Sequence, residues 1–420
     1  MLADLLYLIV PYQIFKSVFF RGGMTFLTAY FLISFVLPSV IRVFRHKNIT
    51  SDFSKKTTTT KGIYTGATPI MGGVVIIPTI MLSTVLWAWI NQYTIALLII
   101  IASFASIGAI DDLVKVFHKR RVESGVSKKK AYLDKADGIR GDLRLILEFA
   151  IAFIVVAIFY LFFEGIDGHI HVPLIPMKTW FPELSLYLFI PLVAMIIVGG
   201  ANAVNLTDGL DSLATVPIIT CAVFVASAAI IAGDPDWSER LKLLYIGEEI
   251  KEVAVFATAL IAACAAFLKF NSPPAQIYMG DVGSLGLGAA VCSMFIFIKA
   301  ELYLPIVGGT FVLAAISSMI QRLWFQIELR RKGREWAEKY RFFYKAPYHH
   351  HQQAMLKYRE GNMEIVSVWH EFLKKLGFGN IPDEDKYINQ EHINNKVIWK
   401  NHIRAIALLV ISMMIYFKVR

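Results

Sequence analysis

The sequence predicts an all-α, polytopic integral membrane protein with about ten transmembrane helices. Of its 420 residues, 56% are hydrophobic and only 18% are charged, whereas charged residues make up about 25% of a typical soluble domain. The apolar residues gather in long runs, near the roughly 20 residues that a helix needs to cross a bilayer. The short segments of alternating polarity that build membrane β-barrels are absent from the sequence.

The expected spans follow one another along the whole chain. Residues 1–22 are apolar but are interrupted by Pro11 and Lys16, so we expect an interfacial or partly inserted helix there. The three cysteines fall inside apolar runs, which favours packing over metal binding. The spans are expected at 25–43, 70–90, 94–117, 144–163, 184–200, 211–232, 252–270, 282–299, 303–327 and 402–418.

Basic residues are concentrated in alternate loops. Segments 44–68, 118–143 and 328–401 are rich in Lys and Arg, whereas 164–183 and 233–251 carry more acidic than basic residues. Because cytoplasmic loops carry the excess of Lys and Arg, the loops after odd-numbered spans are predicted to be cytoplasmic and both termini to lie outside. This topology explains the net charge of +10, so the charge does not indicate a nucleic-acid partner.

The loop 328–401 is expected to be a structured cytoplasmic appendage within a single transmembrane domain that covers residues 1–420. It is longer than a simple connector and contains helix-like pieces at 334–344 and 363–376. No internal repeat indicates a division of the chain.

Unusual polar clusters fall at those ends of the spans that face the expected cytoplasm. A carboxylate at membrane depth costs about 2.5–3.5 kcal/mol on insertion scales, so each cluster needs a reason. Their one-sidedness argues against a transporter, whose ionisable groups would lie near the midplane. The clusters are Asp111-Asp112 and the segments 205–211, 271–275, 279–284 and 346–351.

Taken singly, most clusters have a structural explanation as well. Asp281 follows Gly280 and could cap the N-terminus of a helix. The adjacent carboxylates of Asp111 and Asp112 repel each other unless a cation or a raised pKa relieves them, but a solvated helix end would also tolerate them. The three histidines at 349–351 could lie at the surface, and their spacing fits a zinc site poorly.

Segment 205–211 carries an amide and two carboxylates between two apolar runs. Helical spacing would place Asn205, Asp208 and Asp211 within about a 120° sector at the start of the sixth span. A solvated first turn is the structural alternative to a ligand-binding face.

Together, the clusters indicate metal-assisted phosphate chemistry. Several carboxylates on one membrane face suit Mg²⁺, which binds one or two carboxylates together with phosphate and water oxygens. Lys and Arg of the neighbouring loops would neutralise a pyrophosphate. Chemistry at a membrane edge implies one lipid substrate and one water-soluble substrate, and therefore phosphoryl transfer onto or from a lipid phosphate.

The same motifs resemble the polyprenyl-phosphate N-acetylhexosamine-1-phosphate transferase superfamily. They occur in the family order, and the triple-His segment is typical of its phospho-N-acetylmuramoyl-pentapeptide transferase branch. The matching motifs are Thr68-Pro69-Ile70-Met71-Gly72-Gly73, Asp111-Asp112, Asn205-Leu206-Thr207-Asp208-Gly209-Leu210-Asp211, the stretch 271–275, Met279-Gly280-Asp281-Val282-Gly283-Ser284 and Ala346-Pro347-Tyr348-His349-His350-His351.

The resemblance implies a homodimer in the bacterial cytoplasmic (inner) membrane, with ten spans and a cytoplasmic active site. It implies transfer of phospho-MurNAc-pentapeptide from UDP-MurNAc-pentapeptide to undecaprenyl phosphate, which yields lipid I for peptidoglycan synthesis, releases UMP and requires Mg²⁺. Two alternatives stay open: a related transferase that uses UDP-GlcNAc, and a polytopic transporter.

The resemblance also implies roles for single residues. Asp281 matches the Mg²⁺-binding position, and Asp111 and Asp112 match aspartates assigned to catalysis, with Asp111 the usual candidate base. A base is not compulsory, because a phosphate monoester with a second pKa of about 6 is mostly ionised at pH 7. Direct attack of the lipid phosphate is favoured, and a route through an aspartyl phosphate stays open.

Further positions match the substrate-binding residues of the family. Lys115 keeps its place after the aspartate pair, and Tyr278 sits where relatives carry an aromatic residue that stacks on uracil. The loop that closes over the sugar and diphosphate supplies His349, in a catalytic role, with His350 and His351. The remaining positions of the nucleoside pocket are Asn205, Asp208, Asp211, Asn271, Gly280 and Gln321.

The chain departs from the family pattern in several places. Gln352-Gln353 follow the triple His where relatives carry an aromatic residue and Glu, so a carboxylate near the phosphates is missing. The usual Lys-Lys-Gly is missing before Thr68, so a substrate lysine is expected to be displaced to Lys61. The stretch 358–401 exceeds the family norm and has no assigned function. The longer loop after the aspartate pair leaves several cations without a matched position: Lys128, Lys129, Lys130, Lys135 and Arg144.

Overall fold

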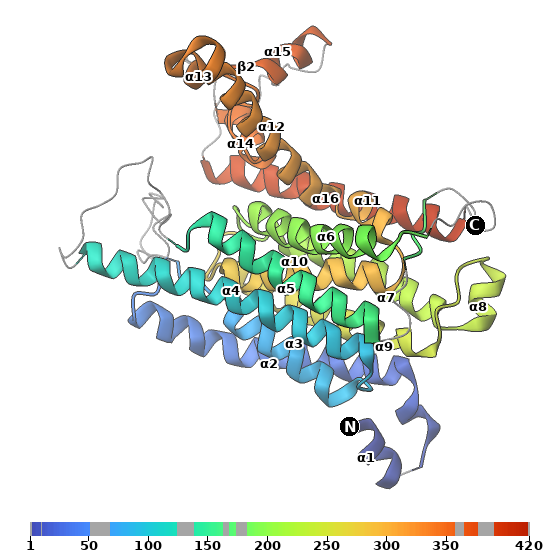
Figure 1. Ribbon diagram of the computed structural model, residues 1–420. Coiled ribbons are helices and arrows are strands. Elements are labelled where there is room, and N and C mark those ends of the chain that lie inside the picture. Colours follow the sequence, from blue (N-terminus) through green and yellow to red (C-terminus); the bar gives the residue numbers. More distant parts are fainter. Residues whose placement is uncertain are drawn as a thin grey trace.

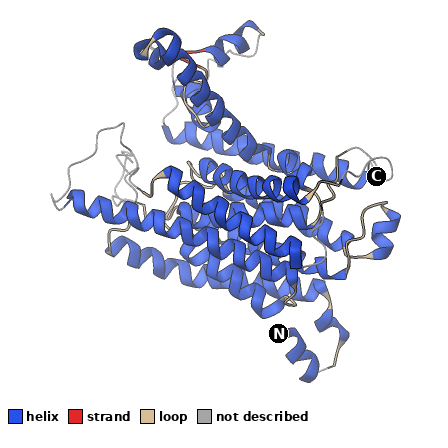
Figure 2. Ribbon diagram, in the orientation of Figure 1, coloured by secondary structure: helices blue, strands red, loops and turns tan. Residues whose placement is uncertain are grey.

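The computed structural model describes residues 2–9, 11–50, 68–123, 138–162, 168–173, 183–357, 365–376 and 390–418. This part is almost entirely helical (Figure 2), and its one sheet pairs β1 (Tyr340–Arg341) with β2 (Val366–Ser367) in parallel. Among the described residues, nine helices are long and apolar enough to cross a membrane, and the shorter Gly73–Trp87 is apolar as well. The prediction of an all-α polytopic membrane protein is confirmed.

Most of the long helices lie side by side in one bundle, and α12 (Gly309–Lys332) projects away from it (Figure 1). In chain order they are α2 (Val18–His46), α3 (Gly73–Trp87), α4 (Gln92–Glu123), α5 (Gly141–Phe162), α6 (Leu186–Thr207), α7 (Thr215–Ala232), α9 (Lys251–Asn271), α10 (Gly280–Phe297), α12 (Gly309–Lys332) and α16 (Gln390–Lys418). The shorter helices are α1 (Leu2–Ile9), α8 (Pro235–Arg240), α11 (Leu304–Val307), α13 (Arg334–Lys339), α14 (Tyr348–Lys357) and α15 (Val368–Lys375), with 3₁₀ turns η1 (Gln13–Lys16), η3 (Glu248–Ile250) and η4 (Glu301–Tyr303).

Helix α10 forms the centre of the bundle. It packs against α3, α4, α6 and α7, and almost all of its residues are buried. Small residues allow neighbouring helix backbones to come close, and Gly288 of α10 shows this: a Cβ there would lie 2.7 Å from Ala201 Cα of α6. All three cysteines are buried in the helices, as the apolar runs predicted.

A buried ion pair connects the first turns of α2 and α9, at the end of the bundle opposite the acidic motifs. Nη1 and Nη2 of Arg21 donate to the two carboxylate oxygens of Glu252 at 2.5 and 2.6 Å. The backbone N–H of Trp89 donates to Glu252 Oε2 at 2.8 Å, and the Trp89 ring stacks on the Arg21 guanidinium at 3.9 Å. Several partners therefore satisfy two charges that would be costly to bury alone.

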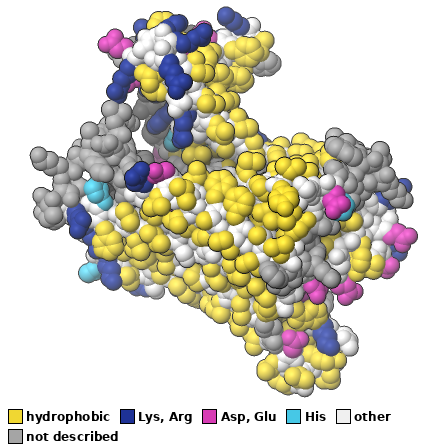
Figure 3. Space-filling view, viewed as in Figure 1, with side chains coloured by type: hydrophobic (Ala, Val, Ile, Leu, Met, Phe, Trp, Pro, Cys, Tyr) yellow, Lys and Arg dark blue, Asp and Glu magenta, His cyan; other side chains and the backbone are white. Residues whose placement is uncertain are grey.

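Helix α12 leaves the bundle and carries an arm that includes α13, the two strands and α15 (Figure 1). Figure 3 shows Lys and Arg side chains gathered on this arm, whereas hydrophobic side chains cover the flank of the bundle. The helix-like pieces expected at 334–344 and 363–376 are shorter in the structure, because the chain enters β1 at Tyr340 and reaches α15 only at Val368.

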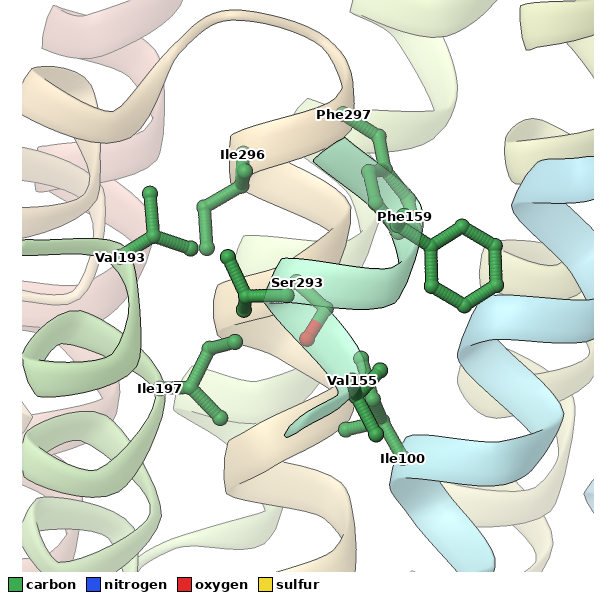
Figure 4. A pocket seen from close by; sticks show the side chains of 9 residues that line it. Ile100, Val155, Phe159, Val193, Ile197, Ser293, Ile296 and Phe297 are labelled. Carbon is green, nitrogen blue, oxygen red and sulfur yellow. The ribbon is translucent and has the colours of Figure 1, made fainter. Parts of the chain in front are cut away.

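A small gap inside the bundle is lined by apolar side chains of α4, α5, α6 and α10 (Figure 4). Its one polar lining residue is Ser293, whose hydroxyl already donates to the Ala289 carbonyl at 2.9 Å. Because none of the described residues that line this gap is charged or carries an unsatisfied polar group, they offer no partner to a phosphate.

Candidate active site

Three carboxylates from two helices converge on one ammonium group. Asp111 and Asp112 lie on α4, and Asp281 lies in the first turn of α10. The Nζ of Lys115 lies 2.6 Å from Asp111 Oδ2, 2.7 Å from Asp281 Oδ2 and 3.7 Å from Asp112 Oδ1. The N-cap position of α10 is Met279, so Asp281 lies past the cap position, in a cluster of charges.

The close approach of α4 and α10 brings these carboxylates together. Gly108 of α4 touches the backbone of Asp281 so closely that a Cβ would clash with its carbonyl group. The Val282 N–H donates to Asp112 Oδ2 at 3.3 Å. Gly280 has φ +76°, a region that favours glycine, and a Cβ there would lie only 2.6 Å from Asp112 Oδ2.

Arg144 of α5 adds a second cation to the cluster. Its Nη1 lies 3.3 Å from Asp281 Oδ2 and 3.7 Å from Asp111 Oδ2. On its other side, Nη2 donates to Asn202 Oδ1 at 3.0 Å, and Nε lies 3.3 Å from Glu148 Oε1. The guanidinium therefore joins α5 to α4, α6 and α10.

Glu148 and Asn202 bind Arg144 on the side opposite Asp111 and Asp281. The Glu148 carboxylate is fully buried and accepts a hydrogen bond from Asn202 Nδ2 at 2.5 Å. The Asn202 amide also donates to the Val198 carbonyl at 2.9 Å. The sequence motifs left Arg144 without a matched family position and did not single out Glu148 or Asn202. The signal that could have found them is the pair of opposite charges, Arg144 and Glu148, four residues apart in an apolar run.

The residue types of the cluster suit a divalent cation, but their arrangement here holds an ammonium group. Four carboxylates face two cations here, so negative charge is in excess when all groups are ionised, and carboxylate oxygens are ligands that Mg²⁺ prefers. Within the described residues, no group of three or more His, Cys, Asp or Glu side chains is arranged to hold a metal ion. At this cluster, the Lys115 ammonium lies between the carboxylates that would be the ligands.

Segment 205–211 forms a turn, and the expectation that its polar residues share the first turn of the sixth membrane helix is wrong. Asn205 lies in the last turn of α6, Asp208 is the C-cap of α6, and α7 begins only at Thr215. The backbone leaves the helical conformation at Asp208, where ψ is +44°, and takes a positive φ of 59° at Ser212.

Contacts with the end of α9 and with the segment that follows it hold this turn in place. Asn271 accepts from the Ser212 N–H at 2.9 Å and donates to the Ile277 carbonyl at 3.0 Å. Asp211 Oδ2 accepts from the Ala275 N–H at 2.9 Å. Asn271 and Asp211 therefore fix the backbone of the site, whatever else they contact.

Asp208 links the turn to the carboxylate cluster. Its pKa is raised well above the usual range, mainly because burial disfavours the charged form and also because Asp281 and Asp112 lie nearby. A hydrogen bond from the Gly280 backbone partly offsets this rise. Burial also raises the pKa of Asp211.

Tyr278 joins the Thr68 motif to the start of α10. Its backbone N–H donates to the Pro69 carbonyl, and its carbonyl accepts from the Gly72 N–H, both at 2.9 Å. The side chain is half-buried, and burial raises the pKa of the phenol. The carboxylates of Asp211 and Asp208 lie near the phenol and raise its pKa further, so Tyr278 lies close to the turn 205–211.

The triple-His segment begins α14, and two of its histidines face the turn. An ideal Cβ on Gly209 would lie 2.8 Å from His349 Nε2 and 3.7 Å from His350 Nε2. His349 is buried, and its Nε2 has no hydrogen-bond partner among the described residues. His351 instead accepts from the Tyr344 N–H at 3.2 Å within an aromatic cluster of the arm. Burial lowers the pKa of His349 to about 3 and that of His351 to about 4.

Comparison with known proteins gives the family. Residues 93–299 match the model of Glycosyl transferase family 4. The chain is 36% identical to the phospho-N-acetylmuramoyl-pentapeptide-transferase of Pelagibacter ubique over 344 residues, which is 81% of this chain and 86% of that protein. It is 32% identical to the protein of that name in Thermodesulfovibrio yellowstonii over 378 residues, 88% of this chain and 95% of the relative. The chain belongs to the phospho-N-acetylmuramoyl-pentapeptide-transferase family.

Membership of this family confirms the resemblance that the motifs indicated. Gln321 of α12 accepts from the Phe343 N–H at 2.8 Å and so supports the segment that leads to the family's triple histidine. The predicted substrate lysine Lys61 lies outside the described residues, as do the unmatched cations Lys128, Lys129, Lys130 and Lys135.

Proposed function

We propose that this protein transfers phospho-MurNAc-pentapeptide from UDP-MurNAc-pentapeptide to undecaprenyl phosphate and so forms lipid I and UMP. Its relatives bear the name of that activity. The observation that carries the proposal is the convergence of Asp111, Asp112 and Asp281 with Lys115 and Arg144. A cluster of this kind within a bundle of apolar helices suits a reaction between a lipid acceptor and a soluble nucleotide.

The site is proposed to face the cytoplasm from the bacterial inner membrane. The loops nearest to it in sequence, 44–68 and 118–143, are rich in Lys and Arg, as cytoplasmic loops are. A homodimer stays a prediction of the resemblance, and the molar mass of the purified protein by light scattering would test it.

Asp281, together with Asp111, would hold Mg²⁺. The excess of carboxylates over cations supports this assignment. When bound, Mg²⁺ offsets negative charge on the diphosphate and on the leaving UMP. Arg144 and Lys115 are cations of the chain that can pair with the same phosphate oxygens.

Transfer proceeds by direct attack of the lipid phosphate. One of its oxygens forms a bond to the β-phosphorus of the UDP-sugar, the bond from that phosphorus to the bridging oxygen breaks, and UMP leaves with the electron pair. No base is needed, because the acceptor is already mostly ionised at pH 7. Both Asp111 oxygens have partners, the Ile139 N–H at 2.7 Å and Lys115 at 2.6 Å, which supports a positioning role over proton abstraction. Positioning and electrostatics then supply most of the rate.

The nucleoside is proposed to lie along the turn 205–211 and Tyr278. The half-buried aromatic ring offers a stacking surface for uracil. His349 and His350 lie close to Gly209 of that turn and would close over the sugar and diphosphate.

Release of UMP from the detergent-solubilised protein tests the proposal. The assay contains undecaprenyl phosphate and Mg²⁺, with either UDP-MurNAc-pentapeptide or UDP-GlcNAc, and we expect release only with the first. Release with UDP-GlcNAc alone would assign the protein to the other branch of the superfamily. A phosphorylated Asp111 or Asp112, trapped with the UDP-substrate alone, would replace direct attack by a two-step route.

A further inference from the structure

The first turns of α16 pack against α14, the helix that begins with the triple histidine. Asn394 and Asn401 of α16 lie seven residues apart and therefore on the same face of the helix. Gln353 Nε2 donates to Asn394 Oδ1 at 2.6 Å, and Asn401 Nδ2 donates to Gln352 Oε1 at 3.2 Å. The two glutamines that depart from the family pattern thus bind to a part of the stretch 358–401, which had no assigned function.

With the Gln353 and Asn394 amides oriented as in this structure, one of these bonds assigns the proton of His350 to a single ring nitrogen. Because Gln353 donates to Asn394 through Nε2, the atom that it turns toward His350 Nδ1, at 2.6 Å, is the carbonyl oxygen Oε1. A carbonyl oxygen only accepts, so Nδ1 must carry a hydrogen. A neutral imidazole has a single N–H, and its Nε2 is then a bare acceptor.

The surroundings of His350 favour the neutral form. Burial lowers the pKa of His350 and the nearby Lys345 lowers it as well, although the bond to Gln353 acts in the opposite direction. The neighbouring His349 ring, 4.3 Å away between centroids, is buried as well, and the same Lys345 lowers its pKa. An amide at position 353 satisfies Nδ1 without supplying the negative charge that would stabilise an imidazolium.

The acceptor nitrogen faces the proposed substrate site. His350 Nε2 lies 3.7 Å from the place of a Cβ on Gly209, in the turn 205–211. That turn leads through Asp208 to the carboxylate cluster, because the Gly280 N–H bonds to the Asp208 carboxylate.

We propose that Asn394 and Gln353 are positioning residues that hold His350 as a neutral hydrogen-bond acceptor for the nucleotide-sugar substrate. In naming the substrate, this inference rests on the proposed function. The group that His350 recognises is a hydroxyl or an amide N–H, both of which an N-acetylated nucleotide sugar carries. An ionised phosphate offers only acceptor oxygens, so it pairs instead with Lys115 and Arg144.

The protonation state can be read without any transferase activity. In ¹⁵N spectra of histidine-labelled full-length protein near pH 7, the His350 signals are identified by their loss in His350→Gln. We expect a protonated Nδ1 and an unprotonated Nε2 in the unmodified protein, and an imidazolium in Gln353→Glu. The matched control is Gln352→Glu, which adds the same charge one residue away and should leave both signals unchanged. A proton on Nε2 in the unmodified protein, or an equal response of the two variants, would overturn the proposal.

The Michaelis constant for the UDP-substrate gives a second readout. An imidazolium cannot accept at Nε2, so Gln353→Glu should raise KM about tenfold, the effect of one lost hydrogen bond. Asn394→Ala, which frees the Gln353 amide to rotate, should raise KM in the same direction, and Gln352→Glu should not. A lower KM in Gln353→Glu would show that His350 donates to a phosphate, and would refute the acceptor role.

Discussion

Replacement of Arg144 by Gln leaves the carboxylate of Glu148 buried without its cation. The Glu148 side chain is 0% exposed, whereas that of Arg144 is 24% exposed. Removal of one partner from a buried ion pair costs about 3–5 kcal/mol. Because Arg144 is partly solvated, we expect the lower end, a loss of about 3 kcal/mol in the free energy of unfolding.

The double variant separates this penalty from the function of the arginine. Glu148→Gln alone keeps an acceptor for the Asn202 amide and leaves Arg144 paired with Asp281, so it should cost about 1 kcal/mol. With both charges removed no unpaired charge is buried, and the double variant should lose about 2 kcal/mol, well below the sum of the single losses. Its UMP release should nevertheless stay about 100-fold below that of the unmodified protein, because the cation proposed to pair with the phosphates is missing.

Two measurements on the same purified proteins check these values. Unfolding in mixed micelles with increasing SDS gives the free energies, and UMP release at saturating and limiting UDP-substrate gives kcat and kcat/KM. Equal stability of Arg144→Gln and the double variant would refute the account of Glu148 as a charge that needs its partner. Full activity of the double variant would show that Arg144 does not act on the substrate.

Other perturbations have equally definite expected outcomes. Asp281→Asn should lower UMP release at least about 100-fold and weaken its dependence on Mg²⁺; an unchanged Mg²⁺ titration of the folded variant would contradict the metal assignment. Gly280→Ala forces a side chain into a left-handed backbone position and should cost about 1–3 kcal/mol and most of the activity, whereas Gly199→Ala, whose Cβ meets nothing within 4 Å, should leave both intact. The pKa is about 3 for His349 and about 4 for His351 in the folded protein, against about 6.5 in the unfolded protein. At a pH between the folded and the unfolded pKa of each histidine, the unfolded state therefore binds more protons than the folded state. The contribution of the two neutral rings to the free energy of unfolding should therefore be fully present above about pH 6.5. It should fall as the pH drops toward 4, by up to about 1.4 kcal/mol per pH unit for each histidine. An unfolding midpoint that is independent of pH over this range would refute the neutral, buried state of the two rings.

The sequence was sufficient to predict the fold class, and it singled out the carboxylates that converge at the candidate site. Apolar runs of membrane length specify helices directly, because no other local structure satisfies the backbone there. Lys115 comes four residues after Asp111, so one helix face carries both. The meeting of this face with Asp281 followed from the family motif alone.

The remaining parts of the site depend on contacts between distant segments. The turn after Asn205 replaces the expected helix start because Asn271 and Asp211 bond it to the end of α9 and the segment that follows. Helical spacing along the sequence gives no information about such contacts with distant residues. Arg144 could not be matched because the preceding loop has an unusual length, and its bond to Asn202 exists only where α5 packs against α6.

The ammonium of Lys115 acts as a built-in counter-ion for the aspartates around it. A site that supplies its own counter-ion can fold before a divalent ion arrives, so treatment with a chelator should stop turnover but leave the unfolding midpoint unchanged. The Mg²⁺ proposed for this site would compete with a tethered cation that cannot diffuse away. A diphosphate would relieve this competition by giving Lys115 a new partner. Metal and nucleotide would then bind more tightly together than either binds alone, and the protein without substrate would bind divalent cations only weakly.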